Sequence, residues 1–206
     1  MKFIELLCSK LCHDLISPIG AINNGLEFLE QSDSNTASEA MDLVRKSSSQ
    51  AAQKLAYYRI ALGSAGLKDL IEIDTVIDLV EKLSSEKNIK IIWSGTESYA
   101  QSKIDRLIGK LILNLALILF ESLSRSGRVQ ITFSKDIRTP EITMSVMSDN
   151  WNLHKDVKTV LESDIPDDLL TVRNVLAYHS KQLALECSKS IVFQEKSKGH
   201  IVLKVI

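Results

Sequence analysis

Residues 4–29 read IELLCSKLCHDLISPIGAINNGLEFL, and this stretch decides how the N-terminal part of the chain folds. Its apolar side chains recur at steps of three and four residues, which is the spacing of one face of an α-helix. They are Ile4, Cys8, Leu11, Leu15, Ile22, Leu26 and Leu29. The pattern predicts one long amphipathic helix, although Pro18 within it removes a backbone hydrogen bond.

A second helix is predicted after the polar linker QSDSN. Thr36 and Glu39 have the spacing of a capping box, in which each side chain bonds to the backbone N–H of the other residue. Gly63 and Gly66 are typical stop signals after its last turn. The apolar stripe of this helix comprises Ala37, Met41, Val44, Ser48, Ala51, Leu55, Tyr58 and Leu62. Residues 1–66 are thus predicted to form a helical hairpin.

Two helices alone leave one flank of each apolar stripe exposed to water. A second copy of the hairpin would cover these flanks and complete a four-helix bundle. We therefore predict a homodimer that forms through residues 1–66.

The pattern changes in residues 67–206, where alternating apolar and polar residues follow helical stretches. We predict a helix capped by Asp74, a buried helix over residues 102–123 and a further helix near residues 168–179. Predicted strands cover residues 89–93, 128–134, 141–147, 183–187, 191–195 and 201–206. The fold class is α+β, in which the hairpin precedes an α/β sandwich with helices on one face of a mixed, mostly antiparallel sheet.

The composition of the chain excludes several classes of function. Lys and Arg total 25 and Asp and Glu total 26, so the net charge of −1 gives no overall attraction to nucleic acid or an anionic membrane. The N-terminus lacks the apolar stretch of a signal peptide, and the most apolar segment, residues 107–120, is too short to span a membrane. The three cysteines are too few for a disulfide framework, and no histidines or cysteines have metal-ligand spacing. We predict a cytoplasmic protein that holds no cofactor or metal and binds neither nucleic acid nor membrane.

His13 lies on the polar side of the first predicted helix. At about 100° per residue it stands about 200° from Leu11, nearly opposite the apolar stripe. Most exposed histidines on helices are merely solvated, but Asp14 can accept a hydrogen bond from the ring Nδ1–H and leave the Nε2 lone pair free to attack. Pro18 lies about one turn further on. These features favour a nucleophilic histidine. The residues that share its outer face are Ser9, Ser17, Gly20 and Asn24.

The residues around His13 resemble a known signalling motif. Residues 11–18, LCHDLISP, resemble the H-[DE]-x-x-x-P box in the phosphotransfer helix of histidine kinases. Residues 11–30, LCHDLISPIGAINNGLEFLE, are similar to the ChpT-type histidine phosphotransferases of alphaproteobacteria, as is the pattern Tyr58-Arg59-x-x-x-Gly63. The resemblance implies a phosphotransferase of a multistep phosphorelay, with His13 as phospho-acceptor and Asp14 orienting its imidazole.

The same resemblance implies the partners of the protein. The phosphoryl group would arrive from the receiver aspartate of a hybrid histidine kinase. It would leave to response-regulator receiver domains of the CtrA type, and the receiver would supply Mg²⁺. From the helix geometry, the residues predicted to contact a receiver are Ser9, Ser17, Gly20 and Asn24, together with Tyr58, Arg59 and Leu62.

Residues 67–206 resemble the ATP-binding domain of histidine kinases, but the residues that would hold a nucleotide are altered. The asparagine pair N-L-x-x-N of that family corresponds to Asn114 and Ile118, and isoleucine cannot be a magnesium ligand. In the D-x-G-x-G box Asp149 is retained, whereas Trp151 and Leu153 replace the glycines. None of the eight glycines lies from position 128 to position 198, although a backbone that approaches a triphosphate closely needs glycine. We predict a degenerate domain that does not bind ATP.

Two alternatives stay open from the sequence. A divergent ATP-dependent histidine kinase would bind an ATP analogue or phosphorylate itself from ATP. A non-catalytic dimeric module would sequester response regulators, and His13 would be incidental to this role.

Overall fold

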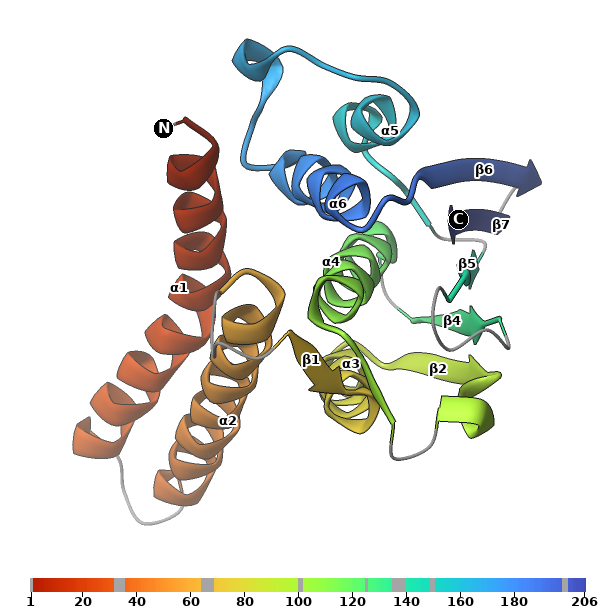
Figure 1. Ribbon diagram of the computed structural model, residues 1–206. Helices are drawn as coiled ribbons and strands as arrows, with labels where there is room; N and C mark the ends of the chain where they lie inside the picture. Colours follow the sequence, from red (N-terminus) through yellow and green to blue (C-terminus); the bar gives the residue numbers. More distant parts are fainter. Residues whose placement is uncertain are drawn as a thin grey trace.

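A computed structural model describes residues 2–31, 36–63, 69–99, 102–124, 126–134, 140–148, 151–197 and 200–206. The first two helices, α1 (Lys2–Gln31) and α2 (Ala37–Ala61), lie side by side and run in opposite directions (Figure 1). This arrangement confirms the predicted helical hairpin. α1 continues as one helix through Pro18, which is buried.

A glycine lets the two helices of the hairpin approach closely. A Cβ atom added at Gly25 on α1 would lie only 2.6 Å from Cγ2 of Val44 on α2. Because real side chains do not tolerate this distance, any larger residue at this position would push the helices apart. The small residues Ala40 and Ala51 of α2 are also buried.

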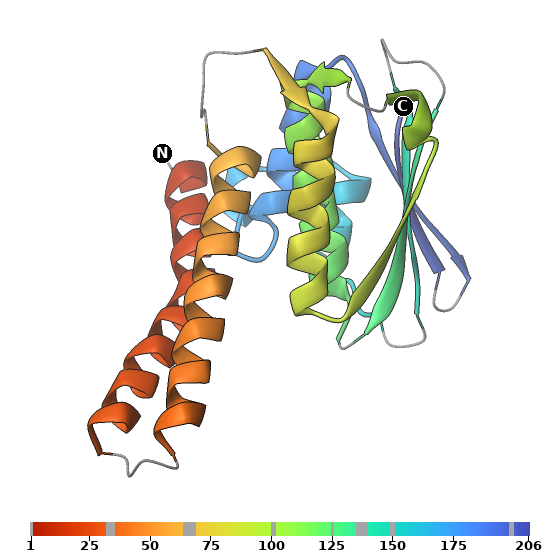
Figure 2. The same cartoon turned by 90° about the horizontal axis from the view of Figure 1, so that it is seen from below.

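The remaining residues form a sandwich of helices on a sheet. The helices are α3 (Ile73–Glu86), α4 (Arg106–Ser122), α5 (Lys155–Glu162) and α6 (Val175–Glu186), with 3₁₀ turns η1 (Thr96–Tyr99) and η2 (Asp167–Leu169). The strands are β1 (Leu70–Glu72), β2 (Ile89–Ser94), β3 (Lys103–Asp105), β4 (Gly127–Phe133), β5 (Ile142–Met147), β6 (Ile191–Ser197) and β7 (His200–Val205). Figure 2 shows that α3, α4 and α6 lie between the hairpin and the main sheet.

The main sheet has the strand order β2-β4-β5-β7-β6. β2 and β4 are parallel and all other neighbouring strands are antiparallel, which confirms the predicted mixed, mostly antiparallel sheet. Along β4 every second residue from Val129 to Phe133 is buried, as its alternating sequence predicted. α4 is buried on all sides from Leu111 to Phe120 and is the central element of the core.

Two predicted helix starts and one predicted capping motif are wrong. Thr36 occupies the N-cap position of α2, but it has helical backbone angles (φ −88°, ψ −19°) and makes no capping hydrogen bond with its side chain. An N-cap side chain normally reaches the first turn from an extended backbone, so the predicted capping box does not form. α3 begins at Ile73 with Glu72 as its N-cap, so Asp74 lies inside the first turn. α4 begins at Arg106, because the Asp105 side chain accepts a hydrogen bond of 2.7 Å from the backbone N–H of Leu107.

The helix predicted near residues 168–179 begins later, and the strand predicted over residues 183–187 does not form. Asn174 holds a turn before α6, because its side chain accepts from the N–H of Thr171 (2.8 Å) and donates to the carbonyl of Leu169 (3.1 Å). α6 then runs through residues 183–186, where the helix formers Leu, Ala and Glu occur. The helix α5 was not predicted, and Gly66 lies outside the described residues.

Two buried hydrogen bonds join the end of α2 to the middle of α4. The hydroxyl of Tyr57 donates to the carbonyl of Leu113 at 2.5 Å. The amide of Asn114 donates in the opposite direction, to the carbonyl of Ala61 at 2.9 Å, and also to that of Lys110 at 2.8 Å. Tyr57 and Asn114 are almost fully buried. We call this contact the α2–α4 junction, and it fixes the direction of the hairpin relative to the sandwich.

The α2–α4 junction predicts a stability effect at Asn114. Asn114→Leu removes both donors from a site closed to water and leaves the carbonyl of Ala61 without this partner. We expect the free energy of unfolding to fall by about 1–3 kcal/mol in urea denaturation followed by circular dichroism. Asn152→Leu, at an exposed asparagine, is the matched control and should stay within about 0.5 kcal/mol of wild type. Equal unfolding midpoints for the two variants would contradict this role of Asn114.

Candidate functional site

His13 projects from α1 into solvent. Its side chain is 80% exposed, and Ser9, Ser17 and Asn24 on the same face are exposed as well. A Cβ atom added at Gly20 would meet no other atom within 4 Å. The predicted outer face is therefore open, and another protein can reach the ring.

Asp14 contacts the His13 ring and is held by two further side chains. Its Oδ1 atom lies 3.1 Å from Nδ1 of His13. The ammonium group of Lys10 lies 2.9 Å from its Oδ2 atom, and the hydroxyl of Tyr58 donates a hydrogen bond to the same oxygen. Only 15% of the Asp14 side chain is exposed. The carboxylate thus connects the exposed histidine to groups in the interior.

The neighbours of Asp14 keep it ionised. Burial acts to raise the pKa of its carboxyl, but the hydrogen bonds from Tyr58 and Lys10 and the charge of Lys10 outweigh burial and lower this pKa below its usual 3.8. Burial, together with the adjacent carboxylate, raises the pKa of the Tyr58 hydroxyl far above its usual 10.0. Asp14 is therefore a carboxylate and Tyr58 a hydrogen-bond donor throughout the neutral pH range.

This charge state determines the tautomer of His13. An ionised carboxylate only accepts hydrogen bonds, so the Nδ1 atom that faces Asp14 must carry the ring proton. In the neutral ring the Nε2 atom then holds the lone pair, on the edge of the ring away from Nδ1. The contact between His13 and Asp14 that the sequence predicted is therefore present, and it leaves Nε2 available as a nucleophile.

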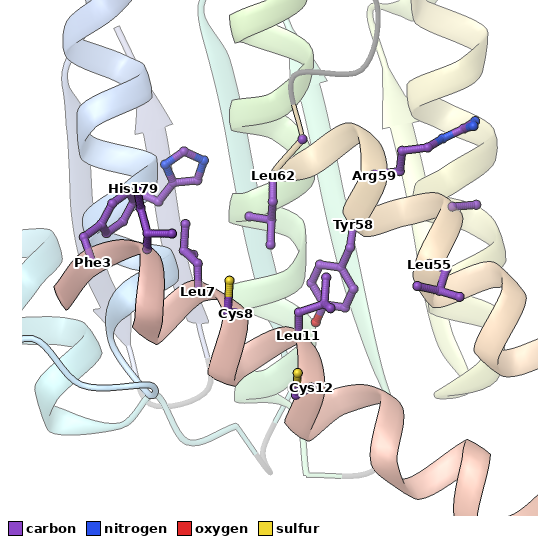
Figure 3. A pocket seen from close by; sticks show the side chains of 13 residues that line it. Phe3, Leu7, Cys8, Leu11, Cys12, Leu55, Tyr58, Arg59, Leu62 and His179 are labelled. Atoms are coloured by element: carbon purple, nitrogen blue, oxygen red, sulfur yellow. The ribbon is translucent and has the colours of Figure 1, made fainter. Parts of the chain in front are cut away.

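A second surface lies between the first half of α1 and the last half of α2 (Figure 3). We call it the apolar groove, and its volume is about 1010 Å³. His13 does not line it. The residues that do include Ile4, Cys8 and Cys12 of α1 and Leu55, Arg59 and Leu62 of α2.

The residues predicted to contact a receiver do not all share one surface within this chain. Tyr58 is only 4% exposed and its hydroxyl bonds to Asp14, so the structure contradicts its predicted role as a surface contact. Tyr58 belongs to the apolar stripe of α2, and this pattern gave no sign that its hydroxyl group would bond to Asp14. Arg59 and Leu62 line the apolar groove, away from the outer face of His13. Their contact with a receiver stays a prediction.

The residues compared with a nucleotide site have other contacts in this fold. Asn114 belongs to the α2–α4 junction, and Ile118 is buried in the core. Trp151 pairs with Leu123 through an isolated β-bridge, and Leu153 packs against the core. Asp149 lies outside the described residues.

Two further features of the described ranges concern metal ions and membranes. Within them, no group of three or more His, Cys, Asp and Glu side chains is arranged to hold a metal ion. None of the helices in these ranges is both long and apolar enough to cross a bilayer. Cys8, Cys12 and Cys187 are free thiols.

This chain is similar to known phosphotransferases. The family described as histidine phosphotransferase C-terminal domain matches residues 73–199. The chain is 29% identical over 188 residues to the protein phosphotransferase ChpT of Brucella abortus (strain 2308), which covers 90% of this chain and 87% of that protein. The solved structure of a bacterial phosphotransferase superposes with a TM-score of 0.86 and 27% identity, over 99% of this chain and 95% of the other. These matches confirm the resemblance found around His13.

Sequence reasoning missed two charged residues of the site. Lys10 is four residues before Asp14, and this spacing places both on one helix face, which was an available signal. Glu121 on α4 lies 2.6 Å from the Lys10 ammonium but 111 residues away in sequence, and no local pattern points to it.

The lowered pKa of Asp14 predicts how stability depends on pH. Because this pKa is lower in the folded chain, the ionised carboxylate stabilises the fold above its unfolded pKa of about 4, and the contribution is lost as pH falls through the folded value. We expect the free energy of unfolding of Asp14→Asn to fall less between about pH 6 and about pH 3 than that of wild type. Urea denaturation at the two pH values measures this. Asp78→Asn, at an exposed carboxylate paired with Lys82, should keep the wild-type dependence, and an unchanged dependence in Asp14→Asn would contradict the prediction.

Proposed function

Since the chain belongs to the histidine phosphotransferase family, we propose that it carries a phosphoryl group on His13 between the aspartates of receiver domains. The donor is the receiver of a hybrid histidine kinase, and the acceptors are response-regulator receivers of the CtrA type. The observation that carries this proposal is the exposed imidazole whose Nδ1 atom lies 3.1 Å from the Asp14 carboxylate.

The proposed loading step is a direct displacement at phosphorus. The Nε2 lone pair of His13 attacks the phospho-aspartate of the receiver, the N–P bond forms, and the aspartate carboxylate leaves with the electrons of the broken P–O bond. The ring keeps its Nδ1 proton and becomes a cation, which the negative charge of Asp14 stabilises. In delivery the carboxylate of the next receiver attacks the phosphorus and the neutral imidazole leaves. Because such transition states are loose, orientation and charge neutralisation provide most of the catalysis.

In the proposed transfer, this chain and the receiver contribute different groups to the reaction. The Mg²⁺ ion that phosphoryl transfer needs is proposed to come from the receiver. This chain provides the oriented imidazole and a surface of small or uncharged side chains at Ser9, Ser17, Gly20 and Asn24. Such residues leave space for a phosphoryl group and place no negative charge against the acidic pocket of a receiver.

We further propose that the C-terminal domain does not use ATP, so the phosphoryl group comes only from other proteins. Asn114, the residue matched to a magnesium-binding asparagine, is fully buried and its amide group is bonded to the carbonyls of Ala61 and Lys110, so its side-chain oxygen, the atom that would bind Mg²⁺, is closed to solvent. Trp151 and Leu153 replace the glycines that would let backbone N–H groups approach a triphosphate.

The cytoplasm is the proposed location of this relay. The thiols of Cys8, Cys12 and Cys187 are free, and free thiols are the ordinary state in a reducing compartment. The proposed partners, receiver domains that carry phospho-aspartate, would have to be in the same compartment.

A labelling experiment tests the carrier role. A receiver phosphorylated with radioactive phosphate is mixed with the protein, and we expect an acid-labile label on wild type. His13→Ala should accept no label while its affinity for the receiver changes little, because the rest of the outer face is intact. His154→Ala, which removes another exposed histidine, is the matched control and should accept the label.

Two results of this experiment would contradict the proposal. Label on His13→Ala would place the carrier at another residue. Label that reaches wild type from ATP alone would make the protein a kinase.

We also propose that a second copy of the chain covers the apolar groove and forms a four-helix bundle. Ile4, Ile19 and Leu26 of α1 are 65%, 47% and 47% exposed, and Leu55 of α2 is 49% exposed. By helix geometry the three α1 residues lie within about 60° of one another and about 120° or more from His13. Two identical hairpins can bury these faces against each other, since a two-fold interface pairs a surface with itself. His13 then stays open on both subunits.

The dimer predicts the effect of a charge on this face. Leu26→Glu would place one carboxylate from each subunit in the buried interface. We therefore expect the dimer dissociation constant to rise by roughly 100-fold or more in analytical ultracentrifugation. Leu169→Glu is the matched control, because Leu169 is 56% exposed in η2, and it should leave the dimer intact. A monomeric wild type, or a Leu26→Glu variant as dimeric as wild type, would contradict the proposal.

A further inference from the structure

A chain of charged groups runs from the C-terminal domain to the phospho-acceptor. Glu121, near the end of α4, lies 2.6 Å from the ammonium group of Lys10 on α1. The same ammonium group lies 2.9 Å from Oδ2 and 3.1 Å from Oδ1 of Asp14. Asp14 in turn contacts Nδ1 of His13 at 3.1 Å. Of these four residues, only Glu121 belongs to the C-terminal domain.

We propose that Glu121, Lys10 and Tyr58 are positioning residues for phosphoryl transfer, and that the C-terminal domain orients the His13 ring through Glu121. The effect of these residues on phosphoryl transfer rests on the carrier function proposed above. The orientation of the ring is a separate property, and it can be measured on the unphosphorylated protein.

Burial makes this arrangement specific. The side chain of Lys10 is only 10% exposed, although lysine is almost never buried without a partner. Burial acts to lower the pKa of its ammonium group, but the charges and hydrogen bonds of Glu121 and Asp14 outweigh burial and raise this pKa above its usual 10.5. Lys10 therefore stays a cation between two carboxylates. If Glu121 lost its charge, Lys10 would keep only one carboxylate partner and would be drawn less strongly toward α4.

The contacts of Asp14 show how the position of Lys10 reaches His13. The hydroxyl of Tyr58 and the ammonium group of Lys10 hold Oδ2, and Lys10 also contacts Oδ1, which faces the ring. Lys54 donates a hydrogen bond of 3.0 Å to the backbone carbonyl of Asp14, which adds a third fixed point. The contacts of Tyr58 and Lys10 set both the rotation and the charge of the carboxylate, and that of Lys54 fixes the backbone that carries it. A carboxylate that rotates freely would hold Nδ1–H less firmly and allow the other tautomer, in which Nε2 has no lone pair.

The α2–α4 junction provides the rigid base for this chain of contacts. Asn114 and Glu121 are seven residues apart on α4, which is nearly two full turns, so both face the hairpin. In the hairpin, Asn114 contacts the carbonyl of Ala61, and Glu121 contacts the ammonium group of Lys10. The same helix therefore attaches the hairpin to the domain and places the carboxylate that holds Lys10. This gives the C-terminal domain a role in transfer that needs no nucleotide.

A matched pair of substitutions tests the proposal. Glu121→Gln removes the charge next to Lys10, and Glu195→Gln does the same at another glutamate paired with a lysine, Lys158 at 3.2 Å. Lys10→Met removes the central charge and keeps a long apolar side chain, whereas Lys10→Arg keeps the charge and can bind both carboxylates. Thermal unfolding of each variant first establishes that it is folded.

The first measurement is the rate of label transfer as a function of phosphorylated receiver concentration. We expect the rate at saturation to fall about tenfold in Lys10→Met and about threefold in Glu121→Gln. The receiver concentration at half saturation should change little, because the docking face is untouched. Lys10→Arg should recover most of the wild-type rate, and Glu195→Gln should equal wild type.

The second measurement uses ¹⁵N NMR of the imidazole of His13, which reports the tautomer without any transfer. We expect the Nδ1–H tautomer to dominate in wild type and Glu195→Gln, and a mixture of tautomers in Glu121→Gln and Lys10→Met. If wild type accepts no phosphoryl group, the carrier function fails, and the tautomers still decide the positioning role. If wild type transfers through His13 but the Glu121→Gln and Glu195→Gln variants agree in rate and tautomer, only the positioning role is overturned.

Discussion

The two hydrogen bonds exchanged across the α2–α4 junction determine how the rest of the molecule is arranged. Tyr57 donates from the hairpin to α4, and Asn114 donates from α4 to the hairpin. Since both are buried, breaking either leaves a polar group without its partner in a place water does not reach, at a cost of about 1–3 kcal/mol. The hairpin is therefore held in one direction against the sandwich. In this direction Glu121 lies beside Lys10, and the outer face with His13 remains open to solvent.

The parts of the fold that depend on local sequence could be predicted. Apolar spacing of three and four residues identified α1, and the same periodicity placed His13 opposite the apolar stripe, because one helix fixes the angle between any two of its residues. Asp14 is adjacent to His13, so their contact also needed no tertiary information. Alternation identified β4 and β5 as paired strands, since their buried residues repeat with a period of two.

The parts that depend on contacts between distant segments could not. Lys10 would be predicted as a solvated charge on the polar side of α1, and it is buried only because Glu121, from a different domain, is present to compensate its charge. Tyr58 fitted the apolar stripe of α2, but its hydroxyl bonds to a carboxylate on the neighbouring helix. The start of α6 was misplaced for a related reason. Asn174 bonds to the backbone of Thr171 and Leu169, and helical periodicity does not report such a side-chain turn.

The rigid junction also bears on the source of the phosphoryl group. A domain that passed phosphate from its own bound ATP to His13 would have to bring the nucleotide to the outer face of α1. Here that motion would break the contacts of Tyr57 and Asn114 and separate Glu121 from Lys10, and it would release the carboxylate that orients the ring at the moment of attack. A visiting receiver requires no such motion, because it approaches from solvent while these contacts persist. The interactions that position His13 are thus compatible with an external phosphoryl donor and oppose an internal one, which supports the carrier role over the kinase alternative.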